Sequence, residues 1–388
     1  MIRADLSLQP SGFLSVAKNA GIKDGTLDFT VVHTEQPAAA AAVFTRNRFC
    51  GHPVTVGREH LRDRRLSTVV VNSKNANVAT GPRGLADTRE ICRLVGAELG
   101  VAERLVLPCS TGVIGRPLPM ERIRAAIRGI GGELHSGGLE GFARAIMTTD
   151  TRPKMRCARV GGAVLAGCCK GSGMIEPHMA TMLAFFFTDA AIEAPELDRM
   201  LHEVVDDSFN MLSVDGDTST SDTAVILANG AAGPVDVAAF AQTLRAMAVE
   251  LTQELAADGE GATKLLEAVI EGAPDLSAAR RIAKSVVNSP LVKTALWGAD
   301  PNWGRVAMAV GKCFDLPLQP ERMRILFGDT AVYDGGDLGE EAVRRLADYL
   351  RGDRVRVTVQ LRLGKASATA WGCDLSPEYV HINGDYTT

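Results

Sequence analysis

The sequence contains few aromatic residues and no excess of positive charge, and these two absences exclude whole classes of function. Phe, Trp and Tyr make up 5% of the 388 residues, and the formal net charge is −4 at pH 7. Proteins that bind single strands stack bases on aromatic rings, and proteins that bind duplexes or anionic membranes carry a basic surface. We therefore expect neither nucleic acid nor a membrane among the partners.

Long apolar runs and paired cysteines are also missing. No stretch approaches the roughly 18 apolar residues of a membrane span, and the opening residues MIRADLSLQP lack the apolar core of a secretory signal. The eight cysteines form no C-x-x-C and no zinc-like spacing with histidine. We expect reduced thiols in a cytoplasmic protein, with Cys168 and Cys169 buried in a strand.

The common catalytic and cofactor motifs are absent too. There is no G-x-G-x-x-G after a strand, no phosphate loop, no H-E-x-x-H and no G-x-S-x-G. Asp215, Asp217 and Asp222 lie in one hydroxyl-rich segment, but a calcium loop needs a longer ligand series that ends in a bidentate acid. We predict a turn there and no metal site.

What is present predicts a layered mixture of strands and helices, of α/β or α+β class. Three apolar stripes at helical spacing contain Met120, Ile123 and Ile127, closed by Gly129; Leu197, Met200, Leu201 and Val204; and Val237, Phe240, Leu244, Met247 and Leu251. Strands are predicted at Leu27–His33, Thr68–Asn72, Ala163–Cys169, Met182–Thr188 and Val355–Leu363. The last alternates cleanly, as a half-buried antiparallel strand does.

Glycine-rich loops suggest where the chain divides. The best candidate for a division is the loop at residues 171–173, and the Pro/Gly loop at 230–234 is a lesser one.

One segment, residues 175–190 (IEPHMATMLAFFFTDA), places a hydroxyl just before an apolar strand. Taken alone, Thr181 is typical of β-branched packing, and His178 of a solvated loop. However, Gly171 and Gly173 allow a sharp bend upstream. Attack of the Thr181 hydroxyl on the preceding carbonyl would cut the chain after Ala180. The freed amine, with an ordinary pKa near 8, could then act as the base for that hydroxyl.

Such a nucleophile needs donors for a tetrahedral oxyanion. The segment Pro108–Gly112 follows the apolar run Leu105–Leu107, and Gly112 allows close approach of a backbone N–H. Without further context, a strand-ending turn is the better interpretation of this segment.

Eight segments together resemble the ornithine acetyltransferase family, the bifunctional glutamate N-acetyltransferases of arginine biosynthesis. They are Lys170–Ala190, Asn72–Asn77 (NSKNAN), Cys109–Gly115 (CSTGVIG), Ala145–Lys154, Phe209–Thr223, Asp258–Lys264, Gly298–Arg305 and Tyr379–Thr388. They occur in order along the whole chain, which makes the resemblance specific.

The resemblance implies an αββα sandwich that cleaves itself between Ala180 and Thr181. Residues 1–180 would form the α chain and 181–388 the β chain, associated as α2β2 or larger. Thr181 would be the nucleophile, and Thr111 and Gly112 the oxyanion hole. The residues implied in substrate binding are Thr148, Lys170, Thr181, Glu260, Asn383 and Thr388. Lys170 suits a carboxylate and Glu260 an ammonium, whereas Asn383 and Thr388 require the C-terminal tail to fold back over the site.

The implied reaction is a ping-pong transfer of acetyl from N2-acetyl-L-ornithine to L-glutamate, without a cofactor. Three alternatives remain open: a hydrolase or aminopeptidase that delivers the acyl group to water, an acyltransferase of secondary metabolism, and a non-catalytic relative. Use of acetyl-CoA as a further donor is also open.

The segments depart from the family pattern at three positions. Lys74 replaces the usual glycine of NSGNAN. Glu176 and His178 stand where many members carry Ala and Asn, which leaves the donor and acceptor preference open.

Overall fold

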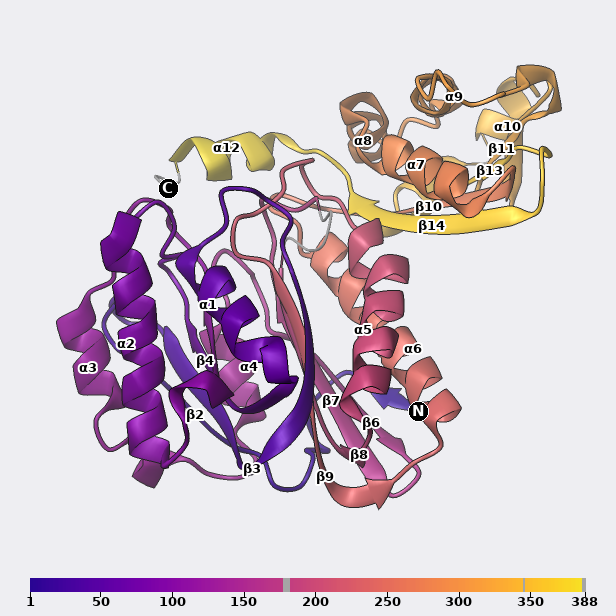
Figure 1. Cartoon of the computed structure of the whole chain (residues 1–388). Helices are drawn as coiled ribbons and strands as arrows, with labels where there is room; N and C mark the ends of the chain where they lie inside the picture. The colour runs from indigo at the N-terminus through magenta and orange to yellow at the C-terminus, as the bar shows by residue number, and fades with distance from the viewer. Residues whose placement is uncertain (177–181, 345, 386–388) are drawn as a thin grey trace.

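The computed structural model describes residues 1–176, 182–344 and 346–385. The predicted residues Ala180, Thr181 and Thr388, and also His178, lie outside this described part. Within it, a nine-stranded sheet and a five-stranded sheet are each covered by helices (Figure 1). This arrangement confirms the expected mixed α/β class with layers of sheet and helix.

The large sheet has the strand order β1-β6-β7-β8-β9-β3-β4-β5, and β2 also pairs with β3. Its strands are β1 (Ile2–Arg3), β2 (Leu14–Lys18), β3 (Phe29–Phe44), β4 (Arg65–Asn72), β5 (Val106–Ser110), β6 (Lys154–Val160), β7 (Ala163–Lys170), β8 (Leu183–Ala191) and β9 (Thr223–Pro234). Most neighbours are antiparallel, but β8 with β9 and β4 with β5 are parallel. The parallel pairs matter for the site, because the loops at their ends meet at one edge of the sheet.

The middle of β8 is buried on both faces. The ring of Phe142 packs edge-on against Phe185 at a centroid distance of 4.9 Å, and Phe186 on the opposite face lies 6.3 Å from Phe209. All four rings are fully buried, and each contributes about 1.5–3 kcal/mol relative to an exposed ring. The apolar run after residue 181 is therefore a core strand that firmly anchors the start of β8.

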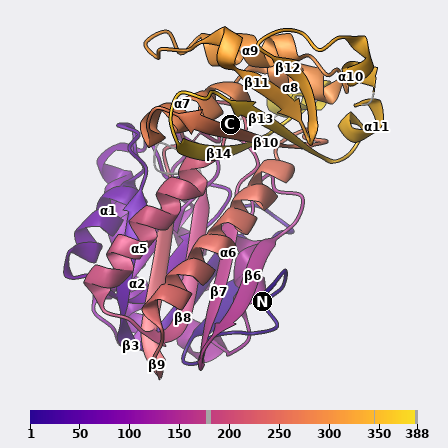
Figure 2. The same cartoon turned by 90° about the vertical axis from the view of Figure 1, so that its right-hand side faces the viewer.

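The helices are α1 (His52–His60), α2 (Gly81–Leu99), α3 (Met120–Ile127), α4 (Leu139–Ala145), α5 (Ala194–Asp207), α6 (Val237–Ala257), α7 (Leu276–Val287), α8 (Pro290–Trp297), α9 (Trp303–Gly311), α10 (Glu340–Arg344), α11 (Ala347–Leu350) and α12 (Pro377–Asp385). Figure 2 shows α5 and α6 side by side across one face of the large sheet, and α4 packs against β2 and β3. Among the described helices, none combines the length and apolar character that a bilayer crossing requires.

The three predicted apolar stripes coincide with α3, α5 and α6. Their residues are buried except Val237, which is 40% exposed because it is the first residue of α6 and lies beyond the sheet. Gly129 follows the end of α3 with φ 75°, a left-handed conformation that ends helices.

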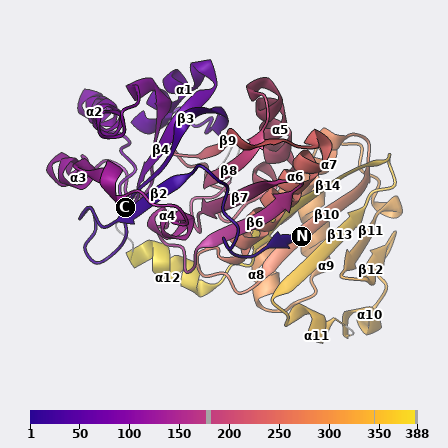
Figure 3. The same ribbon diagram turned by 90° about the horizontal axis from the view of Figure 1, so that it is seen from below.

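The smaller sheet has the order β12-β11-β13-β10-β14. Its strands are β10 (Leu265–Ala273), β11 (Arg324–Phe327), β12 (Thr330–Asp334), β13 (Arg354–Gln360) and β14 (Ala366–Cys373), and α7 packs on β10 and β14. In Figure 3 this sheet lies on the opposite side of the molecule from α2 and α3.

The expected strand Val355–Leu363 needs two corrections. It pairs antiparallel with β11 but parallel with β10, since alternation reports burial and not strand direction. It also ends at Gln360, because Arg362 takes a positive φ of 57° and Leu363 N donates to Gly272 O instead of continuing the ladder.

Neither predicted division separates two packed units. The loop at 171–173 connects β7 to its direct partner β8, and 230–234 is the end of β9. The two sheets instead join where Lys293 Nζ donates to the carbonyls of Val214 and Cys373, at 2.8 and 2.7 Å.

Candidate functional site

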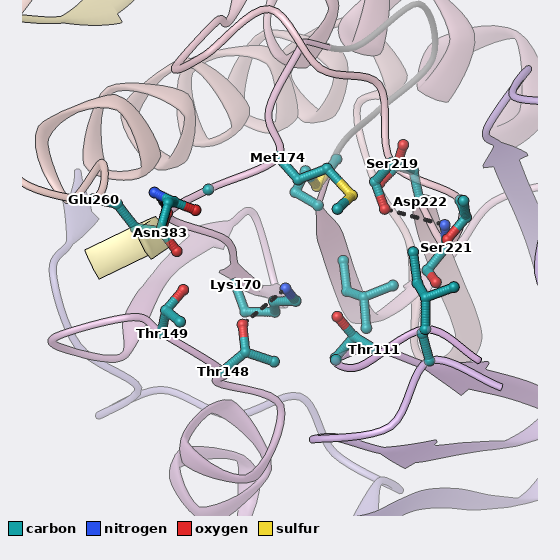
Figure 4. A pocket seen from close by; sticks show the side chains of 17 residues that line it. Thr111, Thr148, Thr149, Lys170, Met174, Ser219, Ser221, Asp222, Glu260 and Asn383 are labelled. Carbon is teal, nitrogen blue, oxygen red and sulfur yellow. Dashed lines mark hydrogen bonds between the residues drawn. The ribbon is translucent and has the colours of Figure 1, made fainter. Parts of the chain in front are cut away.

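A cavity of about 100 Å³ opens where β5 and β7 end and where β8 and β9 begin (Figure 4). Its lining comes from segments distant in sequence: Ala76, Thr111, Gly112, Ile114, Thr148, Thr149, Lys170, Gly173, Met174, Met182, Leu183, Ser219, Thr220, Ser221, Asp222, Glu260 and Asn383. All six of the described residues that the sequence predicted for the site are in this list. Their catalytic and binding roles remain predictions.

Two loops interlock on one side of the cavity. They follow β4 and β5, whose parallel pairing sets Asn72 opposite Ser110. Ser110 Oγ donates to Asn72 Oδ1 at 2.5 Å, and Thr111 N donates to Asn72 O at 3.1 Å. Ala76 N donates to Val113 O at 2.9 Å. These contacts fix the backbone of the predicted oxyanion loop before any ligand arrives.

Gly112 occupies a position that only glycine fits. Its φ is 129°, and a Cβ there would lie 2.2 Å from the carbonyl carbon of Lys74. Its N–H has no hydrogen-bond partner among the described residues. The N–H of Thr111 is bonded to Asn72, so Thr111 can offer only its hydroxyl. One backbone N–H and one hydroxyl are thus available to an oxyanion beside the cavity.

Lys74 explains how the chain accommodates its departure from the family's glycine. The residue adopts φ 74°, the left-handed conformation that glycine adopts easily. Its Nζ donates to Met147 O, next to Thr148. Burial lowers the pKa of Lys74, with help from Lys23 and Lys170 and against Asp150. The loop therefore keeps the glycine backbone and gains a contact with the segment that lines the cavity.

Lys170 is the buried cation of the cavity. It ends β7, is 9% exposed, and its Nζ donates to Thr148 Oγ1 at 3.2 Å. No carboxylate in the described part of the chain forms an ion pair with it. Burial lowers the pKa of Lys170, although Asp150, Asp222 and Glu260 partly oppose this. A ligand carboxylate would supply the missing counter-charge.

A buried ion-pair triad of Asp150, Lys154 and Asp258 holds the backbone on both sides of the Lys170 side chain. Lys154 Nζ contacts Asp150 Oδ1 at 2.7 Å and Asp258 Oδ2 at 2.6 Å. Asp150 also accepts from Gly171 N at 2.6 Å and Thr148 N at 2.9 Å. Burial by itself would raise the pKa of Asp150, but the two neighbouring ammonium groups lower it to about 2. The triad thus ties both Thr148 and the residue after Lys170 to one charged centre.

Glu260 and Asn383 form the wall opposite Thr111 (Figure 4). Glu260 N donates to Ser172 O at 2.8 Å, and a Cβ on Gly173 would lie 2.3 Å from Glu260 Oε2. Asn383 belongs to α12 and donates from Nδ2 to Glu260 Oε2 at 2.9 Å. The C-terminal helix therefore returns to the site and brings an amide to the acidic wall.

The segment 215–222 bounds the cavity on the side of β9. Asp215 accepts from Met174 N at 2.6 Å, Ile175 N at 2.8 Å and Asp217 N at 3.2 Å. It thus organises backbone, which is the turn expected there. Among the described residues, no three His, Cys, Asp or Glu side chains gather as metal ligands.

Glu176 faces a second cleft, of about 600 Å³, that borders α7. Asn288 Nδ2 donates to its Oε1 at 2.7 Å, Ser213 Oγ donates to its Oε2 at 3.0 Å, and Lys284 Nζ lies 3.4 Å from Oε1. The acidic side chain at this position therefore ties the segment before residue 177 to the smaller sheet's layer.

Sequence reasoning missed four charged residues at or behind the cavity: Asp150, Lys154, Asp258 and, as a cavity group, Asp222. Asp150 and Lys154 lie in a segment that carried the resemblance, yet nothing local signals their burial. Asp258 lies 104 residues after Lys154, so only the fold brings them together.

Comparison with known proteins agrees with the geometry. The profile of the ArgJ family matches residues 15–388. The chain is 47% identical over 379 residues to "Arginine biosynthesis bifunctional protein ArgJ 2" of Clostridium acetobutylicum, covering 97% of this chain and 98% of that protein. It is 49% identical over 385 residues to "Glutamate N-acetyltransferase Oat2" of Streptomyces clavuligerus, covering 98% of both.

A solved structure is also similar. The crystal structure of the arginine biosynthesis bifunctional protein argJ of Bacillus halodurans aligns with a TM-score of 0.51 and 38% identity. The alignment covers all of that chain but 53% of this one. With a family match over nearly the whole length and relatives close to half identical, this chain belongs to the ArgJ family.

Proposed function

We propose that the protein transfers an acetyl group from N2-acetyl-L-ornithine to L-glutamate through an ester on Thr181. One observation carries this proposal: Lys170, which is buried and has no carboxylate partner among the described residues, and an acidic wall at Glu260 share a cavity with two hydrogen-bond donors. An N-acetyl amino acid with a distal ammonium presents a carboxylate, a carbonyl and a cation, which these groups complement. The names of the similar proteins support the same transferase activity.

Self-cleavage comes first in this scheme. The Thr181 hydroxyl oxygen attacks the carbonyl carbon of Ala180, the peptide C–N bond breaks, and the nitrogen takes up a proton. Water then hydrolyses the ester, which frees a carboxylate at residue 180 and an amine at 181. The fragments, 1–180 and 181–388, would stay together because β8 and β9 are hydrogen-bonded between β7 and β3.

Acetyl transfer then follows two matching steps. The Thr181 oxygen attacks the acetyl carbonyl carbon while the Thr181 amine takes the hydroxyl proton. The Gly112 N–H and the Thr111 hydroxyl stabilise the oxyanion, and ornithine leaves with the proton on its α-nitrogen. The glutamate amine attacks the ester in the reverse sense, giving N-acetylglutamate and free Thr181.

The experiment uses N2-acetylornithine with labelled acetyl, with and without glutamate, and intact mass of the purified protein. We expect two fragments, and labelled N-acetylglutamate only when glutamate is present. Thr181→Ala should leave one uncut chain without transfer. Thr243→Ala, which removes a hydroxyl from α6 outside the cavity, should behave as wild type.

Other outcomes would select the alternatives. Release of labelled acetate without glutamate would favour a hydrolase, and an uncut 41.2 kDa chain without activity would favour a non-catalytic relative. A panel of donors and acceptors tests acetyl-CoA and secondary-metabolite substrates. The α2β2 assembly and the cytoplasmic location stay predictions.

A further inference from the structure

Gly173 lines the cavity at the place where the Glu260 side chain crosses the backbone after β7. A Cβ at residue 173 would lie 2.3 Å from Glu260 Oε2, 2.4 Å from its Cδ and 2.6 Å from its Oε1, whereas ordinary contacts begin at 3.4 Å. All three atoms belong to one carboxyl group. The Glu260 carboxylate therefore occupies the space that any other residue at 173 would fill.

Hydrogen bonds fix the backbone on both sides of Gly173. Before it, Ser172 O accepts from Glu260 N at 2.8 Å. After it, Met174 N donates to Asp215 Oδ2 at 2.6 Å. Because both neighbours are held, residue 173 cannot easily withdraw from the carboxylate. A side chain added at this position must therefore displace the carboxylate.

The Glu260 backbone is also fixed, so only its side chain can respond. The turn that contains Glu260 is closed by Ala262 N, which donates to Gly259 O at 2.8 Å. Asn383 Nδ2 donates to Glu260 Oε2 at 2.9 Å and orients the carboxylate (Figure 4). Since the carboxylate is the far end of a flexible side chain, it can rotate to another rotamer at small cost. An alanine at 173 would thus shift the negative charge by about 1 Å or more and leave the fold intact.

The position of this charge matters to one class of substrate. Lys170 and Glu260 bring opposite charges to the same cavity. An N-acetyl amino acid with a distal ammonium can pair with both, its carboxylate with Lys170 and its ammonium with Glu260. A charged hydrogen bond needs a donor–acceptor distance of about 2.7–2.9 Å, so a shift of about 1 Å disrupts it. A substrate without the distal ammonium makes no such bond and should not sense the shift.

We propose that Gly173 is a specificity-determining residue: by leaving room for the Glu260 carboxylate, it selects N-acetyl amino acids with a distal ammonium over those with an uncharged side chain. This inference rests on the proposed function. Because Gly173 acts through Glu260, it is a positioning residue and not a catalytic one. The bonds made and broken in acetyl transfer are the same with either class of donor.

The test compares Gly173→Ala with the wild type on two donors that differ by one group. N2-acetyl-L-norvaline has the carbon chain of N2-acetyl-L-ornithine without the terminal amine. Losing a charged hydrogen bond should lower kcat/KM for acetylornithine at least 10-fold, mainly through KM. For acetylnorvaline we expect a change of less than threefold. An equal loss with both donors would show a merely structural role and overturn the inference, as would no loss with either.

Two further variants show whether the effect passes through the carboxylate. Gly162→Ala is the matched control, because Gly162 lies in the turn before β7 and a Cβ there would meet no atom of the described residues within 4 Å. It should keep the wild-type preference, and a loss like that of Gly173→Ala would overturn the inference. In a Glu260→Gln background, Gly173→Ala should lower the preference for acetylornithine by less than a further threefold. A larger additional loss would also overturn it.

Folding and the wild-type preference separate the remaining outcomes. Should circular dichroism show Gly173→Ala unfolded, adding Glu260→Asp shortens the displaced side chain by one carbon and should restore folding; a double variant that stays unfolded would overturn the inference. If the wild type transfers acetyl from both donors equally well, this inference fails while acetyl transfer stands. If it transfers from neither, the proposed function fails and this inference fails with it.

Discussion

Lys154 and Lys170 lie at the same edge of the large sheet, on neighbouring antiparallel strands, and their environments differ sharply. Lys154 begins β6, is 1% exposed and contacts two carboxylates within 2.7 Å. Lys170 ends β7, is 9% exposed and donates to a hydroxyl. Burial opposes the charge of both, but Asp150 and Asp258 raise the pKa of Lys154, whereas the pKa of Lys170 remains lowered.

The difference suggests two roles: Lys154 stabilises the fold, whereas Lys170 is placed to bind a ligand. The two carboxylates neutralise Lys154 within the protein, so substrate has nothing to add there. Lys170 is buried and pairs with no carboxylate in the part of the chain that the structure describes, which makes a bound anion especially favourable. At this end of the strands, Lys154 is therefore neutralised by Asp150 and Asp258, whereas the neighbouring Lys170 can still take an anionic ligand.

Of the variants considered, Lys154→Met should lower the unfolding free energy the most. Lys154→Met leaves Asp150 and Asp258 buried without their cation, a change that typically costs about 3–5 kcal/mol of unfolding free energy. Urea unfolding followed by circular dichroism measures it. Arg144→Met, which breaks the exposed pair with Glu140, should cost less than about 1 kcal/mol. Equal costs for the two variants would mean that the buried triad does not support the fold.

Removing Lys170 should affect binding and not folding. Lys170→Met deletes a buried cation that pairs with no carboxylate in residues 1–176, 182–344 and 346–385, so the unfolding free energy should stay within about 1 kcal/mol of wild type or rise. The loss of a charged hydrogen bond to the substrate carboxylate is worth about 1.5–3 kcal/mol, which is roughly 10- to 150-fold in KM for acetylornithine. Steady-state kinetics measure it. A stability loss as large as that of Lys154→Met would show that both lysines are structural.

The lowered pKa of Lys170 predicts an alkaline limit to activity. As pH rises toward that pKa, the ammonium loses its proton and the substrate carboxylate loses its partner. We expect kcat/KM to begin falling below pH 10.5, the ordinary value for lysine. The titratable groups that act on the pKa of Lys170 are Asp150, Lys154, Asp222 and Glu260.

Lys170→Arg is the control for this limit, since a guanidinium stays charged throughout the range. Its absolute rate should be lower because the guanidinium has a different shape, but its alkaline limb should move to higher pH. An unchanged limb in a kcat/KM profile would assign the titration to another group.

The local sequence pattern was sufficient to predict much of the buried core. It was misleading where pairing between strands distant in sequence determines the secondary structure. The stripes of α3, α5 and α6 are visible because burial imposes a helical period. In contrast, β3 was expected to end at His33 but continues to Phe44, through five consecutive alanines. Alanine favours helix, yet Ala39–Phe44 pair with β9, so the sheet overrides the propensity.

The residues of the site also fall into two groups, those that sequence motifs predicted and those that only the fold brings together. Thr111, Gly112 and Lys170 stand in motifs that resemble a known family, so their convergence could be expected. Asp258 and Lys154 are far apart in sequence, and no local pattern marks either as buried. Glu260 and Asn383 were implied by the same resemblance, which required the C-terminal tail to fold back, but only the folded chain shows that Asn383 Nδ2 donates to Glu260 Oε2.

The third lysine of this region, Lys74, should show the smallest effect. Lys74→Gly removes the strain of a left-handed residue, worth roughly 1–2 kcal/mol, and also removes the Nζ hydrogen bond to Met147 O, worth about 1 kcal/mol. These terms nearly cancel, so we expect the unfolding free energy to change by less than about 1 kcal/mol. Urea unfolding tests this, with Lys23→Gly as the exposed control. A rise in KM above threefold without loss of stability would instead place Lys74 with Lys170, as a cation that the substrate senses.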